Sequence, residues 1–306
     1  CALCRILRQE GLKVAPFKAQ NMSNNSYVTV DGREMGRAQV AQAEAAGIQP
    51  EAEMNPILLK PSGNNGSQII TMGRPLRHMT ANEYYKNKDS MLEIAKEAYQ
   101  SLSNEYDVIV IEGAGSPAEI NIKDNDIVNM KIAEIADAPV ILVTDIERGG
   151  SFAWIVGTLE LLDSDERDRV MGVIINKFRG DMGILESGID MLEERINKPV
   201  LGVLPYFTNI DVDDEDSMNL DKRNRASESS ESQIDIAIIR LPRISNFTDF
   251  DILIREKSLS VRFVEDARSI GNPDLIIIPG TKNTIGDLES IKESGIANAV
   301  TGLANS

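Results

Sequence analysis

Short apolar runs alternate with amphipathic segments along most of the chain. The apolar runs are rich in β-branched residues and have the length of buried strands, and the amphipathic segments repeat apolar residues at helical spacing. The strand-like runs are residues 106–111, 139–144, 169–175 and 200–204. The helix-like segments are residues 90–102, 127–136, 154–162 and 183–196. Continuously apolar strands with helices between them predict an α/β fold in which helices cover both faces of a parallel sheet.

A second alternation begins after a polar, Ser-rich stretch. Residues 211–232 contain an acidic run and then alternate Lys, Arg, Ser and Glu, which predicts a loop or linker. Further apolar runs and one helical pattern follow at residues 234–239, 259–264, 275–278 and 288–300. We therefore predict two domains, residues 1–230 and residues 231–306.

The chain begins with a helical pattern. Leu3, Cys4, Ile6 and Leu7 have the spacing of one buried helix face, and Gly11 ends the pattern. No capping residue precedes it, so we expect the helix to lack its first turn and an upstream segment to be missing. The other end stops without a closing strand, so we expect truncation there too. Cys1 and Cys4 form a C-x-x-C pair without a second ligand pair, which favours helix packing over a zinc or redox site.

The charge narrows the possible partners. The net charge is −16 and the isoelectric point is about 4.6, so the surface repels nucleic acid and anionic lipid. No apolar run reaches the roughly 18 residues of a membrane span, and no signal peptide is present. We therefore expect a cytoplasmic protein that does not partner nucleic acid or membrane.

Three polar residues each directly follow a buried strand-like run. Ligands of parallel sheets bind beyond the carboxyl ends of the strands, which selects Glu112, Asp145 and Asn176. Glu112 could hold Mg²⁺ while the glycine at 113 lets the backbone approach a phosphate. Asn176 could read the edge of a nucleobase, and Lys177 could neutralise phosphate. Tight turns and capped loops explain each motif about equally well when it is taken alone.

The segment of residues 18–47 is dense in amides and hydroxyls. Lys18 follows a strand-like run, where its ammonium could meet a phosphate. Gln39 and Gln42 lie on an Ala-rich helix that could pack closely on a partner. A solvated loop followed by a surface helix is the simpler alternative.

The motifs taken in order resemble the cobyric acid synthase family over nearly the whole chain. The carrying segments are P-F-K-A-Q-N-M-S-N-N-S at 16–26, G-R-A-Q-V-A-Q-A-E-A-A-G at 36–47, N-P-I-L-L-K-P at 55–61, E-G-A-G-S-P-A-E-I-N at 112–121, D-I-E-R-G-G-S-F-A at 145–153, I-N-K-F-R-G-D at 175–181 and P-G-T-K-N-T at 279–284. Several of these are specific at the level of eight or more residues.

The resemblance implies ATP-, Mg²⁺- and glutamine-dependent amidation of a corrinoid carboxylic acid. Adenosylcobyrinic acid a,c-diamide would become cobyric acid through a phosphorylated carboxylate that ammonia attacks. The first domain would be a P-loop NTPase-like three-layer domain of the dethiobiotin synthetase type, and the second would be the start of a class I glutaminase-like α/β domain.

The resemblance also implies residue roles. Lys18, Glu112 and Asp145 would be catalytic, with Glu112 on Mg²⁺ and Lys18 facing the transferred phosphate. Asn176, Lys177, Arg148 and Gly113 would contact ATP. The substrate would be bound by Gln20, Asn21, Ser23, Gln39 and Gln42.

Two departures from the family pattern stand out. No G-x-x-x-x-G-K-[ST] P-loop occurs, and the only Cys and His residues, Cys1, Cys4 and His78, lie in the first domain, so a glutaminase Cys–His pair is missing. We expect the chain as written to be inactive. The alternatives are a cobyrinic acid a,c-diamide synthase-type amidoligase, a plain P-loop ATPase, and a non-catalytic corrinoid- or nucleotide-binding fragment. A homo-oligomer is also possible.

Overall fold

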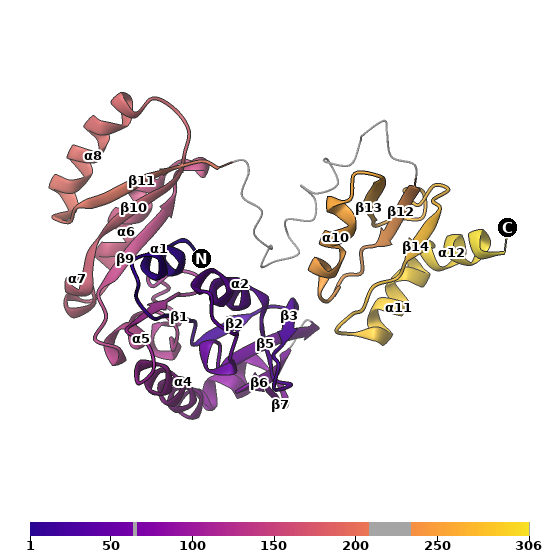
Figure 1. Cartoon of the computed structure of the whole chain (residues 1–306), viewed down its shortest axis with the longest axis horizontal. Helices are drawn as coiled ribbons and strands as arrows, with labels where there is room; N and C mark the ends of the chain where they lie inside the picture. The colour runs from indigo at the N-terminus through magenta and orange to yellow at the C-terminus, as the bar shows by residue number, and fades with distance from the viewer. Residues whose placement is uncertain (64–65, 208–233, 306) are drawn as a thin grey trace.

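The computed structural model describes residues 1–63, 66–207 and 234–305 of the 306-residue chain. Two bodies of secondary structure are visible, one before and one after residues 208–233 (Figure 1). The predicted linker at 211–232 and the predicted boundary at 230 lie outside the described residues.

The first body is an α/β domain. Its helices are α1 (Ala2–Gln9), α2 (Arg37–Ala46), α3 (Ala81–Lys86), α4 (Lys88–Ser103), α5 (Met130–Ile135), α6 (Ser151–Leu161), α7 (Ser164–Arg169) and α8 (Met182–Ile196). Its strands are β1 (Val14–Phe17), β2 (Gln20–Met22), β3 (Ser26–Val28), β4 (Glu34–Gly36), β5 (Ile57–Gly63), β6 (Gly66–Thr71), β7 (Arg74–Met79), β8 (Val108–Ile111), β9 (Val140–Asp145), β10 (Val170–Phe178) and β11 (Val200–Pro205).

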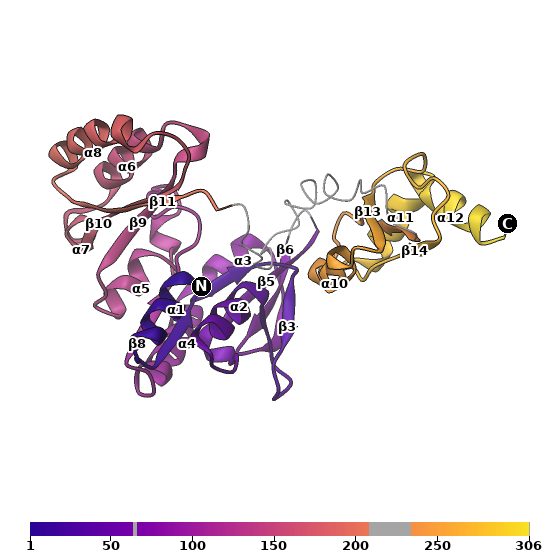
Figure 2. The same ribbon diagram turned by 45° about the horizontal axis from the view of Figure 1, so that its top comes forward.

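The parallel pairings follow the predicted strands. β1 pairs with β8, and β10 lies between β11 and β9. The helices α6 and α8 lie on one face of the β9–β10–β11 sheet (Figure 2), where Val140 and Leu142 pack into a core with Ile155 and Leu192. The predicted α/β fold with parallel sheets is confirmed. The other face of this sheet is open, since the alternate residue Val143 is 63% exposed.

A mixed sheet was not predicted. β2, β5, β6 and β7 pair in that order, with β2–β5 parallel and the other two pairs antiparallel. β3 and β4 form a separate antiparallel hairpin. In β5 and β6 the polar residues Lys60, Ser67 and Gln68 interrupt the apolar ones, so these strands lack the continuous apolar character on which the strand predictions rested.

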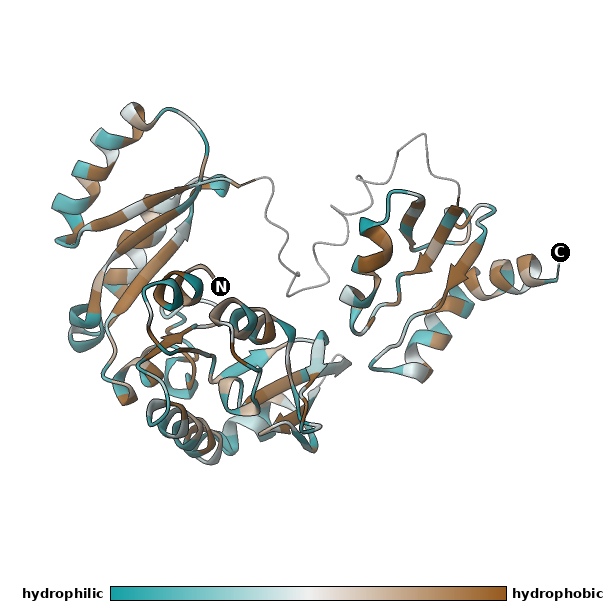
Figure 3. Cartoon of the chain, viewed as in Figure 1, coloured by the Kyte–Doolittle hydropathy of each residue, from teal (hydrophilic) through white to brown (hydrophobic). Residues whose placement is uncertain are grey.

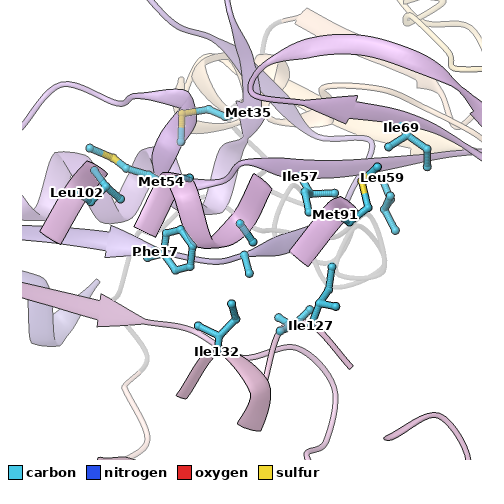
Figure 4. Close-up of a cluster of buried hydrophobic side chains, with 14 of the residues drawn as sticks. Phe17, Met35, Met54, Ile57, Leu59, Ile69, Met91, Leu102, Ile127 and Ile132 are labelled. Atoms are coloured by element: carbon cyan, nitrogen blue, oxygen red, sulfur yellow. The ribbon is translucent and has the colours of Figure 1, made fainter. Parts of the chain in front are cut away.

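The main core joins the two kinds of sheet. Phe17 of β1, Ile57 and Leu59 of β5, and Ile69 of β6 are buried together with Ile132 of α5 (Figure 4). Phe17 also meets Tyr99 of α4 edge to face. This core fixes the carboxyl ends of β1 and β8 next to the start of β2.

The first helix is confirmed, but its predicted buried face is wrong. In α1 only Cys4 is buried, whereas Leu3 and Ile6 are 47% and 53% exposed. Cys4 packs with Val14 and Ala46, so the contact of α1 with the domain is narrow. Both cysteines are free, and burial raises the pKa of the Cys4 thiol.

The second body has a parallel sheet in the order β13–β12–β14. Its elements are β12 (Ile234–Ile239), α10 (Asp251–Arg255), β13 (Leu259–Val264), β14 (Leu275–Ile277), α11 (Thr284–Glu293) and α12 (Ile296–Ala304). The apolar strands stand out in Figure 3. The single helical pattern at 288–300 is wrong: Gly295, with φ +78°, separates α11 from α12. Within the described residues, no helix has the length and apolar character needed to cross a bilayer.

Candidate functional site

Lys18 and Glu112 meet where the paired strands β1 and β8 end. Lys18 Nζ lies 3.1 Å from Glu112 Oε1. The register Phe17–Ile111 puts both residues one position beyond the last strand pair, and the Glu112 amide donates to the Phe17 carbonyl at 2.8 Å. The Lys18 side chain is 6% exposed and that of Glu112 is 37% exposed. A buried ammonium therefore faces a carboxylate that remains open to solvent on one side.

The other carboxylate oxygen of Glu112 has a second donor. Gln42, on α2, donates from Nε2 to Glu112 Oε2. The helix is buried along Gln39, Val40 and Ala43, so the expected alternative of a surface helix is wrong. Lys18 and Gln42 together fix the orientation of the Glu112 carboxylate.

The remaining amides of the 18–47 segment form a buried network. Asn21 Nδ2 donates to Gln39 Oε1 at 3.0 Å, and both residues are almost fully buried. Asn55 donates to the carbonyl of Lys18 at 3.1 Å and accepts from the Gly36 amide at 3.0 Å. Asn55 thus holds the backbone at Lys18, while the Asn21–Gln39 bond ties β2 to α2. Asn55 lies within the segment 55–61, but no role could be predicted for it from the sequence.

Ser23 belongs to the same support. Its hydroxyl accepts from the Asn25 amide at 2.9 Å, and Ser23 is 6% exposed. Gln20 differs, because its Oε1 accepts a hydrogen bond from the Tyr84 hydroxyl at the wall of a cavity. Burial raises the pKa of Tyr84 above its usual range, so this hydroxyl stays a donor.

The loop after Glu112 is clamped by a residue that sequence reasoning missed. Asn129 accepts from the Ala114 amide and donates to the Ala114 carbonyl, both at 2.9 Å. A Cβ at position 113 would lie 2.3 Å from Asn129 Oδ1, so Gly113 is required for this close approach. Gly115 has φ +63°, which glycine adopts readily. The clamp is invisible in the sequence, because it joins residues 15 positions apart through a loop.

Asp145, the last residue of β9, lies beside Asn176, which is two residues before the end of β10. Both were expected just after their strands, but each lies within its strand, near the carboxyl end. Asp145 Oδ2 is 2.7 Å from Lys177 Nζ, and Asp145 Oδ1 accepts from the Glu147 amide at 2.9 Å. The hydrogen bond from Lys177 holds the pKa of the Asp145 carboxyl below its usual range, and the charge of Arg148 acts in the same direction. Arg148 is exposed.

One cavity is lined by Gln20 and Ala114, which lie two residues beyond Lys18 and Glu112, respectively. It has a volume of about 820 Å³, within the range of roughly 300–1,000 Å³ that is usual for ligand sites. Its apolar wall includes Leu59, Ile69 and Met79, and its polar groups include Gln20 and Asn129. We call it the large cavity.

A second cavity connects the motifs. It has a volume of about 690 Å³ and is lined by residues 115–119 after Glu112 and by Thr144 and Asp145 of β9. Residues 115–117 and Glu119 also line the large cavity. The loop after Glu112 therefore forms part of the wall of both cavities. Glu112 follows β8 and Asp145 ends β9, and these two strands belong to different sheets.

The expected metal role rests on Glu112 alone. Within residues 1–63, 66–207 and 234–305, no group of three or more His, Cys, Asp or Glu side chains gathers as a metal site. His78 is exposed on β7, where Nε2 contacts the Ser62 hydroxyl.

Comparisons with known proteins agree with this geometry. Residues 1–220 match the CobQ/CobB/MinD/ParA nucleotide binding domain family, and residues 235–306 match the CobB/CobQ-like glutamine amidotransferase domain. Cobyric acid synthase of Pelotomaculum thermopropionicum is 54% identical over 301 residues, which are 98% of this chain and 57% of that protein.

Two further relatives give the same result. Cobyric acid synthase of Ruminiclostridium cellulolyticum is 56% identical over 96% of this chain and 56% of the relative. Cobyric acid synthase of Listeria monocytogenes serotype 4b is 54% identical over 99% of the chain and 59% of the relative. The chain thus spans less than two thirds of the length of these relatives. The resemblance inferred from the ordered motifs is confirmed.

Proposed function

Since this chain belongs to the CobQ/CobB/MinD/ParA nucleotide-binding family, we propose that it forms the ATP- and acceptor-binding part of a glutamine-dependent amidoligase. The reaction is amidation of peripheral carboxylates of adenosylcobyrinic acid a,c-diamide to give cobyric acid. The relatives carry the name of that enzyme. Because the chain spans less than two thirds of their length, the activity of the whole protein is inferred from them.

The observation that carries the proposal is the Lys18–Glu112 pair, with Gln20 and Ala114, each two residues further along the chain, in the lining of the large cavity. Carboxylate amidation through an acyl phosphate needs a cation near the transferred phosphoryl group and an anchor for Mg²⁺. We assign the cation to Lys18 and the anchor to Glu112, and their separation of 3.1 Å supports this assignment. Gln20, two residues beyond Lys18, lines the cavity.

The large cavity fits the acceptor. A corrinoid carboxylic acid combines a broad apolar ring with carboxylates at its rim. The apolar wall at Leu59, Ile69 and Met79 could pack against the ring. The polar side chains of Gln20 and Asn129 could form hydrogen bonds with the carboxylates at its rim. Asn21, Ser23 and Gln39 support the backbone of this region, and Gln42 orients Glu112.

The residues present also fit Mg-ATP. Mg²⁺ is usually bound by one or two carboxylates together with substrate phosphates, so the partly exposed Glu112 suffices on the protein side. ATP supplies the phosphoryl group that activates the acceptor carboxylate. We assign Gly113, on the loop after Glu112, to the approach to phosphate. Asp145, Arg148, Asn176 and Lys177, which lie around the carboxyl ends of β9 and β10, are assigned to the nucleotide.

The second domain bears on the source of the ammonia in the proposed reaction. Residues 235–306 match a glutamine amidotransferase domain, which is consistent with glutamine as the source of ammonia. The Cys and His residues of this chain, Cys1, Cys4 and His78, lie in the first domain. We therefore assign the acceptor and nucleotide sites to residues of this chain, but no glutaminase nucleophile.

A calorimetric titration tests the proposal. Cobyrinic acid a,c-diamide added to the chain should bind, and Mg-ATP should change the affinity because the proposed reaction brings the acceptor carboxylate to the ATP phosphate. Cobalamin, whose peripheral carboxylates are already amidated, serves as the matched control and should bind more weakly. Equal binding of cobalamin, or no binding of the acid, would contradict the assignment of the large cavity.

A further inference from the structure

The mixed sheet has two faces with different neighbours. Side chains of consecutive strand residues point to opposite faces. Leu59 and Ile69 are cross-strand partners, and both line the large cavity. Lys60 and Gln68 are the next cross-strand pair and therefore lie on the other face, which we call the outer face.

The outer face carries a compact polar cluster within the first domain. Lys60 forms an ion pair with Glu34 of β4. Ser26 links the two, since its hydroxyl accepts from Lys60 Nζ at 2.9 Å and donates to Glu34 Oε1 at 2.7 Å. Lys60 is 7% exposed, so its ammonium is buried within this cluster.

Two loops of the second domain contact this face. Lys282 donates to Gln68 Oε1, and Asn283 Nδ2 donates to the Ser62 carbonyl at 3.2 Å. From the other loop, Asn246 Oδ1 accepts from the Ser26 amide at 3.1 Å. Figures 1 and 2 both show the second domain next to the part of the first domain that contains β3, β5 and β6.

The two loops are tied together by a buried carboxylate. Asp287 of α11 is 1% exposed and accepts from the Arg243 amide at 3.0 Å and from Arg243 Nη1 at 3.1 Å. It also accepts from the Thr281 hydroxyl, directly before Lys282. A buried charge with this many donors fixes both loops as one rigid edge.

We propose that Lys282 is a positioning residue that docks the second domain on the outer face of the β2–β5–β6–β7 sheet. The second domain then lies against the back of the wall that forms the large cavity. This reading rests on the proposed function only in calling that cavity the acceptor site. The contact itself uses groups on both domains.

The electrostatics at Lys282 agree with a docked position. Burial lowers the pKa of Lys282, and the nearby charge of Lys60 lowers it further, whereas Glu34 acts in the opposite direction. The ammonium groups of Lys282 and Lys60, one from each domain, thus both interact with the Glu34 carboxylate. Asn283 caps α11 by accepting from the Gly286 amide at 3.0 Å, so the loop reaches the sheet in a fixed shape.

Small-angle scattering and hydrogen exchange of the whole chain test the docking. K282M should raise the radius of gyration and speed amide exchange in residues 66–71 and 279–284. K292M is the matched control, because Lys292 is an exposed residue of α11, and it should behave as the unsubstituted chain. K282R should restore most of the protection, since a guanidinium can also donate to Gln68.

A second readout separates positioning from a merely structural role. K282M should weaken binding of cobyrinic acid a,c-diamide several-fold, while its circular dichroism stays unchanged. If K282M leaves scattering and exchange as they were, the docking role is refuted. If K282M alters both but the acid still binds with unchanged affinity, Lys282 does not act on the cavity, and the proposal is overturned. If the unsubstituted chain does not bind the acid, the proposed function fails, and scattering and exchange still decide the docking.

Discussion

Lys18 Nζ and Glu112 Oε1 lie 3.1 Å apart, although the residues are 94 positions apart in the sequence. The parallel pair β1–β8 creates this contact, because both strands end at the same level. Glu112 also accepts from Gln42 on its other oxygen. A carboxylate held on both oxygens is pre-oriented for a ligand on its open side.

Replacing Lys18 should lower the rate of amidation much more than it lowers the stability of the fold. K18M removes the cation that faces Glu112, and we expect amidation to fall by a factor on the order of 10²–10³. The assay uses ammonium as the nitrogen source and a protein that carries these residues at the full length of the relatives.

The control for that experiment is K13M. Lys13 is exposed just before the same strand β1, so its loss should leave the rate unchanged. Equal rates for K18M and K13M would remove Lys18 from the site.

Gly36 is expected to resist substitution. A Cβ at this position would lie 2.7 Å from Asn21 Nδ2 and 2.9 Å from Gln39 Oε1. G36A should therefore lower the free energy of unfolding by about 1–3 kcal/mol, which denaturant titration measures. G157A is the control, because a Cβ there meets nothing within 4 Å on α6 and should stabilise the helix slightly. A neutral G36A would mean that the amide network around Lys18 is loose.

The Glu34–Lys60 pair should make stability depend on pH in acid. Burial raises the pKa of Glu34, but hydrogen bonds from Lys60 and Ser26 outweigh it and hold the pKa below the usual 4.5. A lowered folded-state pKa adds stability above the unfolded value, and this stability disappears as pH falls through the folded value. E34Q should lower the free energy of unfolding by about 1–2 kcal/mol at neutral pH.

The same comparison at low pH completes the test. The difference between the unsubstituted chain and E34Q should shrink as pH falls below 4.5, because Glu34 then becomes neutral. A difference that stays constant into strong acid would show that the ion pair does not carry the effect.

Tyr84 should contribute to binding in the large cavity. Its hydroxyl donates to Gln20, and both residues line the cavity. Y84F should weaken binding of cobyrinic acid a,c-diamide about 5- to 10-fold, as expected for one lost hydrogen bond. Calorimetry measures the affinity, and Y106F, whose ring lies outside the cavity lining, should bind normally. Unchanged binding by Y84F would argue that Gln20 does not face the ligand.

The strands that carry the site could be predicted, and the support around them could not. Continuous apolar runs identified β8, β9 and β10, and Glu112, Asp145 and Asn176 were predicted as site residues from their positions near the strand ends. The sequence missed β7, because five of its six residues are exposed and its place depends on cross-strand pairing. It also missed Asn129, whose role depends on a loop that folds back on Gly113.

The most direct test of the central claim is acceptor-dependent ADP release in E112Q. The measurement uses ammonium, Mg-ATP and cobyrinic acid a,c-diamide, with a protein that carries these residues at the full length of the relatives. The isosteric change keeps the contact with Gln42 possible but removes the charge that would hold Mg²⁺. We predict that acceptor-dependent ADP release falls by a factor on the order of 10² or more. A rate in E112Q equal to that of the unsubstituted enzyme would contradict the assignment of the Lys18–Glu112 pair as the site of carboxylate activation.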